Sequence, residues 1–204
     1  MRLQATCLLA TAISTTFAAG QIAPGGLKYS PAVNSTALRC RYVGSFESIR
    51  KVDFVNLYYY DGDGKTGDLF QLRNGKVKVK YPIGAEEITL DRVYYFRPSK
   101  AEPEAALVQL EWFSAGGSSS MDCVLYVFQL DEGSLVATQR LSFDLQAEGT
   151  GTDFARASNT LTVRARSNDD SAHCCPRSID IVTFKWTGKK FTEVSDRTIP
   201  VKGR

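Results

Sequence analysis

The sequence contains little histidine and cysteine, and beyond its N-terminus it has no long apolar run. Its 204 residues include one histidine and five cysteines, and the hydrolase motifs GxSxG and HExxH do not occur. No run after Gly20 is apolar enough to span a bilayer, and long amphipathic helix patterns are also missing. The sequence therefore carries no signature of the common serine hydrolases and zinc proteases, or of a helical membrane protein.

Charge of one sign is also not in excess. The chain has 25 Lys and Arg residues against 22 Asp and Glu residues, a net charge of +3. A small balance of this kind produces no strong field around the molecule, so nucleic acid is not an expected partner.

The N-terminus has the layout of a secretory signal peptide. Arg2 precedes an apolar, small-residue run over 5–19 that contains no charged side chain. Thr, Ser and Gly dilute this run, which argues against a membrane anchor. Cys7 lies inside the run and not at its end, which argues against a lipid-modified N-terminus. We therefore expect cleavage after Ala18 or Gly20 and a secreted or periplasmic mature protein.

Export changes how the cysteines are interpreted, because disulfides persist outside the cytoplasm. Without Cys7, the cysteines are Cys40, Cys123, Cys174 and Cys175. A bond between neighbours is strained, since adjacent Cα atoms lie about 3.8 Å apart and disulfides prefer roughly 4.4–6.8 Å. We expect Cys174 and Cys175 to form a disulfide staple, one bonding to Cys40 and the other to Cys123. The sequence leaves both cross-pairings open.

The stretch SAHCCPRS, which holds these paired cysteines, allows three other interpretations. A zinc site would use His173 with thiolates, but adjacent cysteines lack the usual ligand spacing and would have to stay reduced. A bond between Cys174 and Cys175 could act as a redox switch, because strained disulfides are easily reduced. The third interpretation is a hydrolase that uses His173. His173, Cys174 and Cys175 are thus a candidate redox, metal or catalytic cluster beside the staple that we expect.

The rest of the chain has the pattern of β-strands. In TLTVRARS, Leu161, Val163 and Ala165 fall on one face and polar residues on the other. Turn sequences such as DGDGKTGD, RNGK and DEG separate segments rich in β-branched and aromatic residues. These segments are VDFVNLYYY, EEITLDRVYYF, EAALVQLEWF, DCVLYVFQL and SIDIVTFKW. We expect a mainly β fold, an antiparallel sandwich, roll or open barrel in a single domain, with no helix longer than about four turns.

The expected organisation has three parts. They are a signal peptide at 1–20, an extended leader at 21–45 and the β-rich domain at 46–204. Within that domain, the apolar parity of SIDIVTFKW changes between Ile181 and Val182. A β-bulge near these two residues would put all its apolar side chains on one face.

The turn DGDGKTGD is a candidate for weak calcium binding. It holds Asp61, Asp63 and Asp68, and alternating carboxylates can converge on a hard cation. An EF-hand loop would need a carboxylate or amide at Lys65, glycine at Thr66 and glutamate at Leu72. Because these positions do not match, we expect a hairpin connection, with calcium as the alternative.

The segment RNGKVKVKY places Lys76, Lys78 and Lys80 on one face of an expected strand. Outward-facing lysines protect an edge strand against aggregation, which is the role that we expect. The functional alternative is contact with an anionic polymer or lipid headgroup.

The C-terminal half also carries a family resemblance. LVQLEWFSAGGSSSMDCVLYVFQLDEGSLVA followed by SAHCCPRSIDIVTFKWTGKKFTEV resembles a group of uncharacterised exported bacterial proteins. Around the paired cysteines it is similar to mycobacterial lipoproteins of the LppP/LprE type. The resemblance covers 50–195, and its specific elements are GG at 116–117, YVF at 126–128, CC at 174–175 and KW at 185–186. It implies an exported bacterial domain and assigns no reaction.

Together these observations favour an exported, non-catalytic β domain that binds a partner or maintains the cell envelope. The expected partner is a protein, a glycan or another envelope component, and we expect no metal or cofactor. The alternative is an exported redox protein or hydrolase that uses His173, Cys174 and Cys175.

Overall fold

Strands make up most of the chain that the structure describes. In this computed structural model, the described residues are 5–7, 33–42, 44–62, 67–81, 84–114, 121–145, 150–167 and 177–201. The strands are β1 (Ala5–Cys7), β2 (Val33–Tyr42), β3 (Tyr58–Gly62), β4 (Gly67–Gln71), β5 (Lys76–Tyr81), β6 (Gly84–Phe96), β7 (Ala105–Ser114), β8 (Met121–Asp131), β9 (Ser134–Asp144), β10 (Gly151–Ala155), β11 (Thr160–Arg166), β12 (Ser178–Trp186) and β13 (Phe191–Pro200). The helical elements are the short 3-10 turns η1 (Ile49–Lys51) and η2 (Phe54–Asn56). Among the residues described, no helix is long and apolar enough to cross a membrane.

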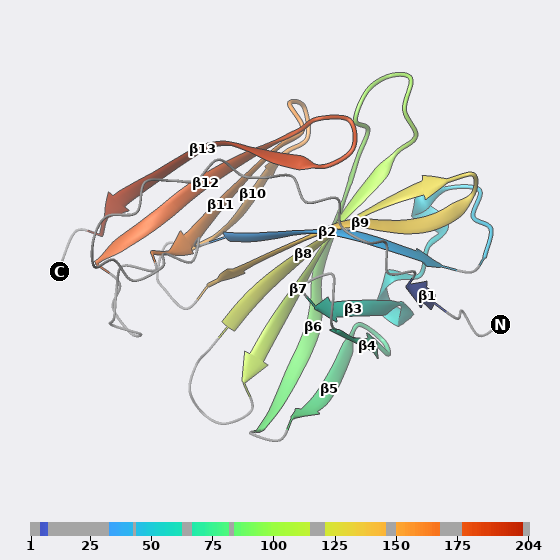
Figure 1. The fold of residues 1–204 in the computed structure, drawn as a ribbon, viewed down its shortest axis with the longest axis horizontal. Helices are drawn as coiled ribbons and strands as arrows, with labels where there is room; N and C mark the ends of the chain where they lie inside the picture. Colours follow the sequence, from blue (N-terminus) through green and yellow to red (C-terminus); the bar gives the residue numbers. More distant parts are fainter. Residues whose placement is uncertain are drawn as a thin grey trace, which may run out of the picture.

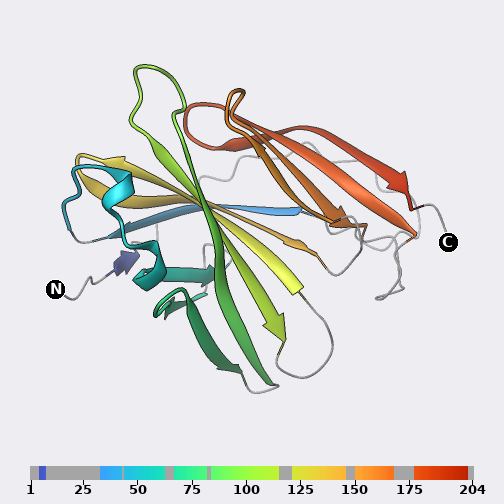
Figure 2. The same ribbon diagram turned by 180° about the vertical axis from the view of Figure 1, so that it is seen from behind.

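The strands form three layers (Figure 1). A seven-stranded sheet in the order β1-β2-β9-β8-β7-β6-β5 lies in the middle, and the four-stranded sheet β10-β11-β12-β13 packs on one of its faces. The hairpin β3–β4 and the two 3-10 turns cover the other face, as the reverse view shows (Figure 2). Neighbouring strands pair antiparallel, and the described strands form no closed barrel. The expected mainly β, antiparallel fold is confirmed, in the form of an open sandwich.

The central sheet separates two apolar cores, because alternate residues of a strand face opposite sides. On β8, Val124 and Tyr126 face the first core, between the central sheet and β3–β4. Cys123 and Leu125 face the second core, between the central sheet and the four-stranded sheet. The whole run 123–128 is buried, so β8 is apolar on both faces, as a central strand of a layered fold is.

Tyrosines of the central sheet hold β3 in place over the first core. The hydroxyl of Tyr42 donates to the carbonyl of Tyr58 at 2.7 Å, and that of Tyr126 donates to the carbonyl of Tyr60 at 2.9 Å. Burial raises the pKa of Tyr42, and the neighbouring Tyr126 raises it further. The Tyr42 phenol therefore stays protonated and remains a donor to β3.

A β-bulge in β9 connects the central sheet to the four-stranded sheet. β9 carries one extra residue, Thr138, opposite the step 127–128 of β8. The bulge turns Gln139 toward the second core, where it is 2% exposed. The amide oxygen of Gln139 accepts from the backbone N–H of Phe191, and its amide nitrogen donates to the Phe191 carbonyl, both at 2.8 Å. The first residue of β13 is thereby fixed to the central sheet.

A second buried glutamine joins the same two sheets. Gln109 on β7 is 4% exposed and accepts from the hydroxyl of Thr152 on β10 at 2.8 Å. The rings of Phe96, Phe154 and Trp186 pack together in this core. The second core therefore combines aromatic packing with hydrogen-bonded amides, which is the condition for burying amides at low cost.

The expected turns RNGK and DEG are confirmed. Asn74 and Gly75 have φ values of 53° and 82°, and Glu132 and Gly133 have 50° and 79°. Two successive positive φ values are typical of the tight turns that follow the twist of antiparallel strands. Accordingly, the second turn joins β8 to β9.

Two expected boundaries differ from the structure. The segment 52–56, expected to be strand, contains η2, because the side chain of Asn56 donates to Asp53 at 2.8 Å and accepts from the backbone of Asn74 at 2.9 Å. The leader expected at 21–45 includes β2, which pairs with β9 inside the central sheet. The β domain therefore begins before residue 46.

The bulge expected near 181–182 is also placed elsewhere. β12 pairs regularly with β11 through both residues, and the irregularity lies between Thr183 and Phe184 in the pairing with β13. Ile181 and Val182 are both buried although they face opposite sides. The long side chains of Arg164 and Arg197, opposite Ile181 on the neighbouring strands, can cover it with their apolar stems.

Replacing Gln139 with leucine should destabilise the fold. The N–H and carbonyl of Phe191 would lose their partners inside the second core, and we expect a decrease of roughly 2–4 kcal/mol in the free energy of unfolding. Urea unfolding followed by tryptophan fluorescence measures this decrease. The matched control is Gln109→Leu, because its partner Thr152 is half-buried and can turn its hydroxyl to water. Equal decreases in the two variants would contradict the role of Gln139.

Candidate functional site

Cys123, expected to belong to the disulfide staple, is a free thiol. It lies on β8 and is fully buried in the second core. Cys40 lies on β2 in the first core and is disulfide-bonded. Cys174 and Cys175, together with His173, lie outside the described residues. The disulfide expected at Cys123 is therefore not formed, and this part of the sequence-based prediction is wrong.

The reason lies in the two faces of the central sheet. Cys40 and Cys123 face opposite cores, with the sheet between them. A disulfide reaches only about 4–7 Å between Cα atoms, so two adjacent cysteines cannot readily bond to thiols on both sides of one sheet. Burial raises the pKa of the Cys123 thiol, and the carboxylate of Glu111 raises it further. Cys123 is thus a protonated, packed side chain without the thiolate that redox chemistry needs.

Alkylation should show this state of Cys123. In the native protein iodoacetamide should leave Cys123 unmodified, because the side chain is covered. In denaturant without reductant the peptide containing Cys123 should become alkylated, and mass spectrometry detects the added mass. A Cys123 peptide that is modified only after reduction would contradict the free thiol.

The candidate calcium ligands Asp61, Asp63 and Asp68 are not seen to form a cation site within the residues that the structure describes. β3 and β4 pair antiparallel with Asp61 opposite Asp68, which confirms a hairpin around DGDGKTGD. The Asp61 carboxylate accepts from the guanidinium of Arg140 at 2.9 Å. Asp63 and the side chain of Asp68 lie outside the described part. Within the described residues, no group of three or more His, Cys, Asp or Glu side chains is placed to hold a metal ion.

The lysine stripe lies on an edge strand. β5, which carries Lys76, Lys78 and Lys80, is the last strand of the seven-stranded sheet, and all three lysines are exposed. Lys78 pairs with Glu87 on β6, with 3.4 Å between Nζ and the carboxylate. This placement fits edge protection, and the neighbouring carboxylate weakens the stripe as an anion-binding surface.

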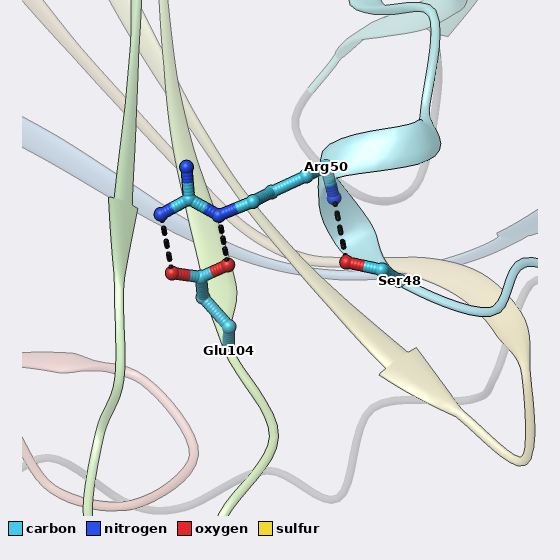
Figure 3. Close-up of polar contacts among 3 residues, drawn as sticks. All are labelled: Ser48, Arg50 and Glu104. Atoms are coloured by element: carbon cyan, nitrogen blue, oxygen red, sulfur yellow. Dashed lines mark hydrogen bonds and ion pairs between the residues drawn. The ribbon is translucent and has the colours of Figure 1, made fainter.

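A stronger polar constellation lies at the far end of β6. Nε and Nη2 of Arg50 donate to the two carboxylate oxygens of Glu104 at 2.6 and 2.7 Å, in the two-pronged geometry of Figure 3. The backbone N–H of Arg50 donates to the Ser48 side chain at the start of η1. The guanidinium carbon also lies 4.6 Å from the centre of the Tyr95 ring, a cation–π contact. Arg50 is thus held by a carboxylate and an aromatic ring.

Four chain segments meet around this ion pair. They are η1 (Ile49–Lys51), the β6–β7 loop at 97–104, the β10–β11 turn at 156–159 and the β12–β13 turn at 187–190. We call them together the basic end. The loop after β6 and the turns of the four-stranded sheet lie at the same end of the molecule in both ribbon views (Figures 1 and 2).

Specific contacts connect these segments. The side chain of Asn159 donates to the carbonyls of Arg97 and Pro98 at 3.2 and 3.1 Å. The backbone N–H of Trp186 donates to the carbonyl of Asn159 at 3.1 Å. A Cβ atom added to Gly188 would lie 3.6 Å from the carboxylate of Glu102. The two turns and the loop are therefore fixed side by side and not merely close in projection.

The basic end concentrates positive charge. Its basic residues are Arg50, Lys51, Arg97, Lys100, Arg156, Lys189 and Lys190, and all of them are exposed. Its acidic residues are Glu102 and Glu104. Seven basic and two acidic residues give +5, whereas the whole chain carries +3, so the rest of the chain has a net charge of −2. The four segments are therefore more basic than the rest of the chain.

The neighbouring positive charges affect the pKa of Glu104. The hydrogen bonds from Arg50 lower the pKa of Glu104, and the positive charges of Arg50, Arg97 and Arg156 lower it further, against an opposing effect of burial. Glu104 is therefore ionised at neutral pH. Arg50 cannot give up its proton in this range either, so the pair of Arg50 and Glu104 offers no group for proton transfer.

Sequence reasoning missed this constellation because its members are distant in the chain. Arg50 and Glu104 are separated by 54 residues, and no local motif contains both. One signal was present, since RASN and TGKK, the two turns of the four-stranded sheet, are both basic. In an antiparallel sheet, alternate turns reach the same end, so these two basic turns could have been expected side by side.

No protein-family model, no curated protein and no solved structure matches the chain.

Replacing Arg50 with glutamine should raise the pKa of Glu104. The native carboxyl should titrate below 4.5, its ordinary value, so the ion pair should contribute to stability above that pH and lose its contribution as the pH falls through the lowered pKa. An NMR pH titration of the Glu104 side chain in both proteins measures the difference. Identical titration curves would show that Arg50 does not control this carboxylate.

Proposed function

We propose that this chain is an exported, non-catalytic β domain that binds an anionic component of the cell envelope through the basic end. The concentration of seven exposed basic side chains on four adjacent segments is the observation that supports this proposal. Loops positioned by a rigid sheet scaffold are a common place for binding residues. The signal-like N-terminus and the resemblance to exported bacterial proteins support the location.

The chemistry of the basic end favours binding over catalysis. Arg50 stays protonated and Glu104 stays ionised in their ion pair. A general acid or base needs a pKa near the working pH, which neither of these two groups supplies. The alternative of a redox protein or hydrolase that uses His173, Cys174 and Cys175 stays a prediction, because those residues lie outside the described part of the chain.

The test follows the full chain through export and onto the envelope. After expression in a bacterium, N-terminal sequencing of the protein outside the cytoplasm should find cleavage after Ala18 or Gly20. The purified mature protein should sediment with washed envelope fragments at low salt and be released at high salt, because salt screens exposed charges. Retention of Met1, or failure to sediment with envelope fragments, would contradict the proposal.

A further inference from the structure

We propose that the anionic component is the phospholipid headgroup layer of a membrane, on which the basic end docks with its loop tips toward the lipid. This inference rests on the proposed function and names the partner for the same surface. It concerns the four segments of the basic end, all of which the structure describes.

The exposure of the basic side chains points to a multivalent partner. All seven are solvent-exposed, and an exposed ion pair with one small anion is weak in water. A charged membrane surface engages the side chains together, and each Lys or Arg near it raises the partition coefficient about fivefold. We expect the net charge of +5 on the four segments to give measurable binding, although no single contact is strong.

The composition of the basic end favours lipid over an acidic polysaccharide. Sugar rings commonly stack on exposed aromatic faces, but the Tyr95 ring is covered by the guanidinium of Arg50. Five of the seven basic residues belong to a loop and two turns that reach the same end of the molecule (Figures 1 and 2), an arrangement suited to a broad surface. The exposed large apolar residues Val55, Leu69, Phe113, Val194, Ile199 and Val201 all lie outside the four segments. Docking is therefore electrostatic and at the headgroups, without insertion into the acyl chains.

Glu104 competes with the membrane for the guanidinium of Arg50. It occupies two N–H donors of Arg50, and it lies within the electrostatic range of Arg97 and Arg156. Neutralising Glu104 raises the net charge of the basic end from +5 to +6 and frees Arg50 for a phosphate. Glu104→Gln should therefore increase membrane affinity, whereas loss of any nearby arginine should decrease it.

Vesicle sedimentation with the full mature chain tests the proposal. The protein should bind vesicles of phosphatidylcholine mixed with phosphatidylglycerol and should not bind phosphatidylcholine alone. Glu104→Gln should bind about fivefold more tightly and Arg156→Gln about fivefold more weakly, one charge in each direction. Both substitutions lie at the surface or its edge, so we expect both variants to keep the fold. Circular dichroism and thermal unfolding verify this.

Lys78→Gln is the matched control, because it removes one positive charge at a distant place. Lys78 pairs with Glu87, ten positions before Arg97, which is roughly 30 Å along β6. That distance exceeds the Debye length of about 10 Å at 0.1 M salt, so Lys78→Gln should change vesicle binding less than twofold. An effect of Lys78→Gln equal to that of Arg156→Gln would overturn the assignment to the basic end.

Two further measurements separate the other possible partners. Inorganic phosphate should release the protein no better than chloride at equal ionic strength, and stronger release would overturn surface docking in favour of a discrete phosphate site. Binding to dextran sulfate beads but not to the anionic vesicles would overturn the lipid assignment and leave the proposed function intact. Failure to bind both the vesicles and the envelope fragments would overturn the proposed function as well.

Discussion

Gln139 holds the first residue of β13 against the central sheet, and the second core forms around that contact. Both hydrogen bonds go to Phe191, whose ring packs on Trp186 and Phe96. The contact exists because Thr138 bulges out of β9 and turns the amide inward. One irregular residue in one strand thus gives the second sheet a polar attachment point, while the aromatic rings supply the apolar area.

The basic end follows from the same attachment. Fixing the start of β13 also fixes the turn 187–190, and Asn159 then connects the neighbouring turn to the loop after β6. The loop after β6 and the two turns of the four-stranded sheet therefore reach one end of the molecule (Figure 1). The like charges on these neighbouring segments repel one another. The hydrogen bonds of Asn159 and the ion pair of Glu104 hold the segments together against that repulsion.

The sequence was sufficient to predict strands in which apolar and polar residues alternate and strands that are apolar throughout. It was insufficient where side-chain hydrogen bonds favour a turn over a strand. SIDIVTFKW is β12, and TLTVRAR is β11. The segment 52–56 was misassigned because the side chain of Asn56, which bonds to the Asp53 side chain and to the backbone of Asn74, favours a turn within an apolar stretch. The parity change at Ile181 suggested a bulge, whereas arginines of the neighbouring strands offer cover for the second apolar face. Cys123 was misassigned because sequence does not reveal which face of a sheet a cysteine occupies, and the ion pair of Arg50 was missed because only the folded sheet brings it to Glu104.

The position of β2 has a consequence for the kinetics of folding. β2 lies between β1 and β9, and Ser35 contacts Gln139 across 104 residues of chain. The central sheet cannot be completed until β9 has been synthesised, and closing so long a loop slows folding. A domain with such non-local pairing folds more slowly after synthesis, and the export that we propose would benefit from that delay. The same strand order that builds two cores on one sheet therefore keeps the newly made chain open.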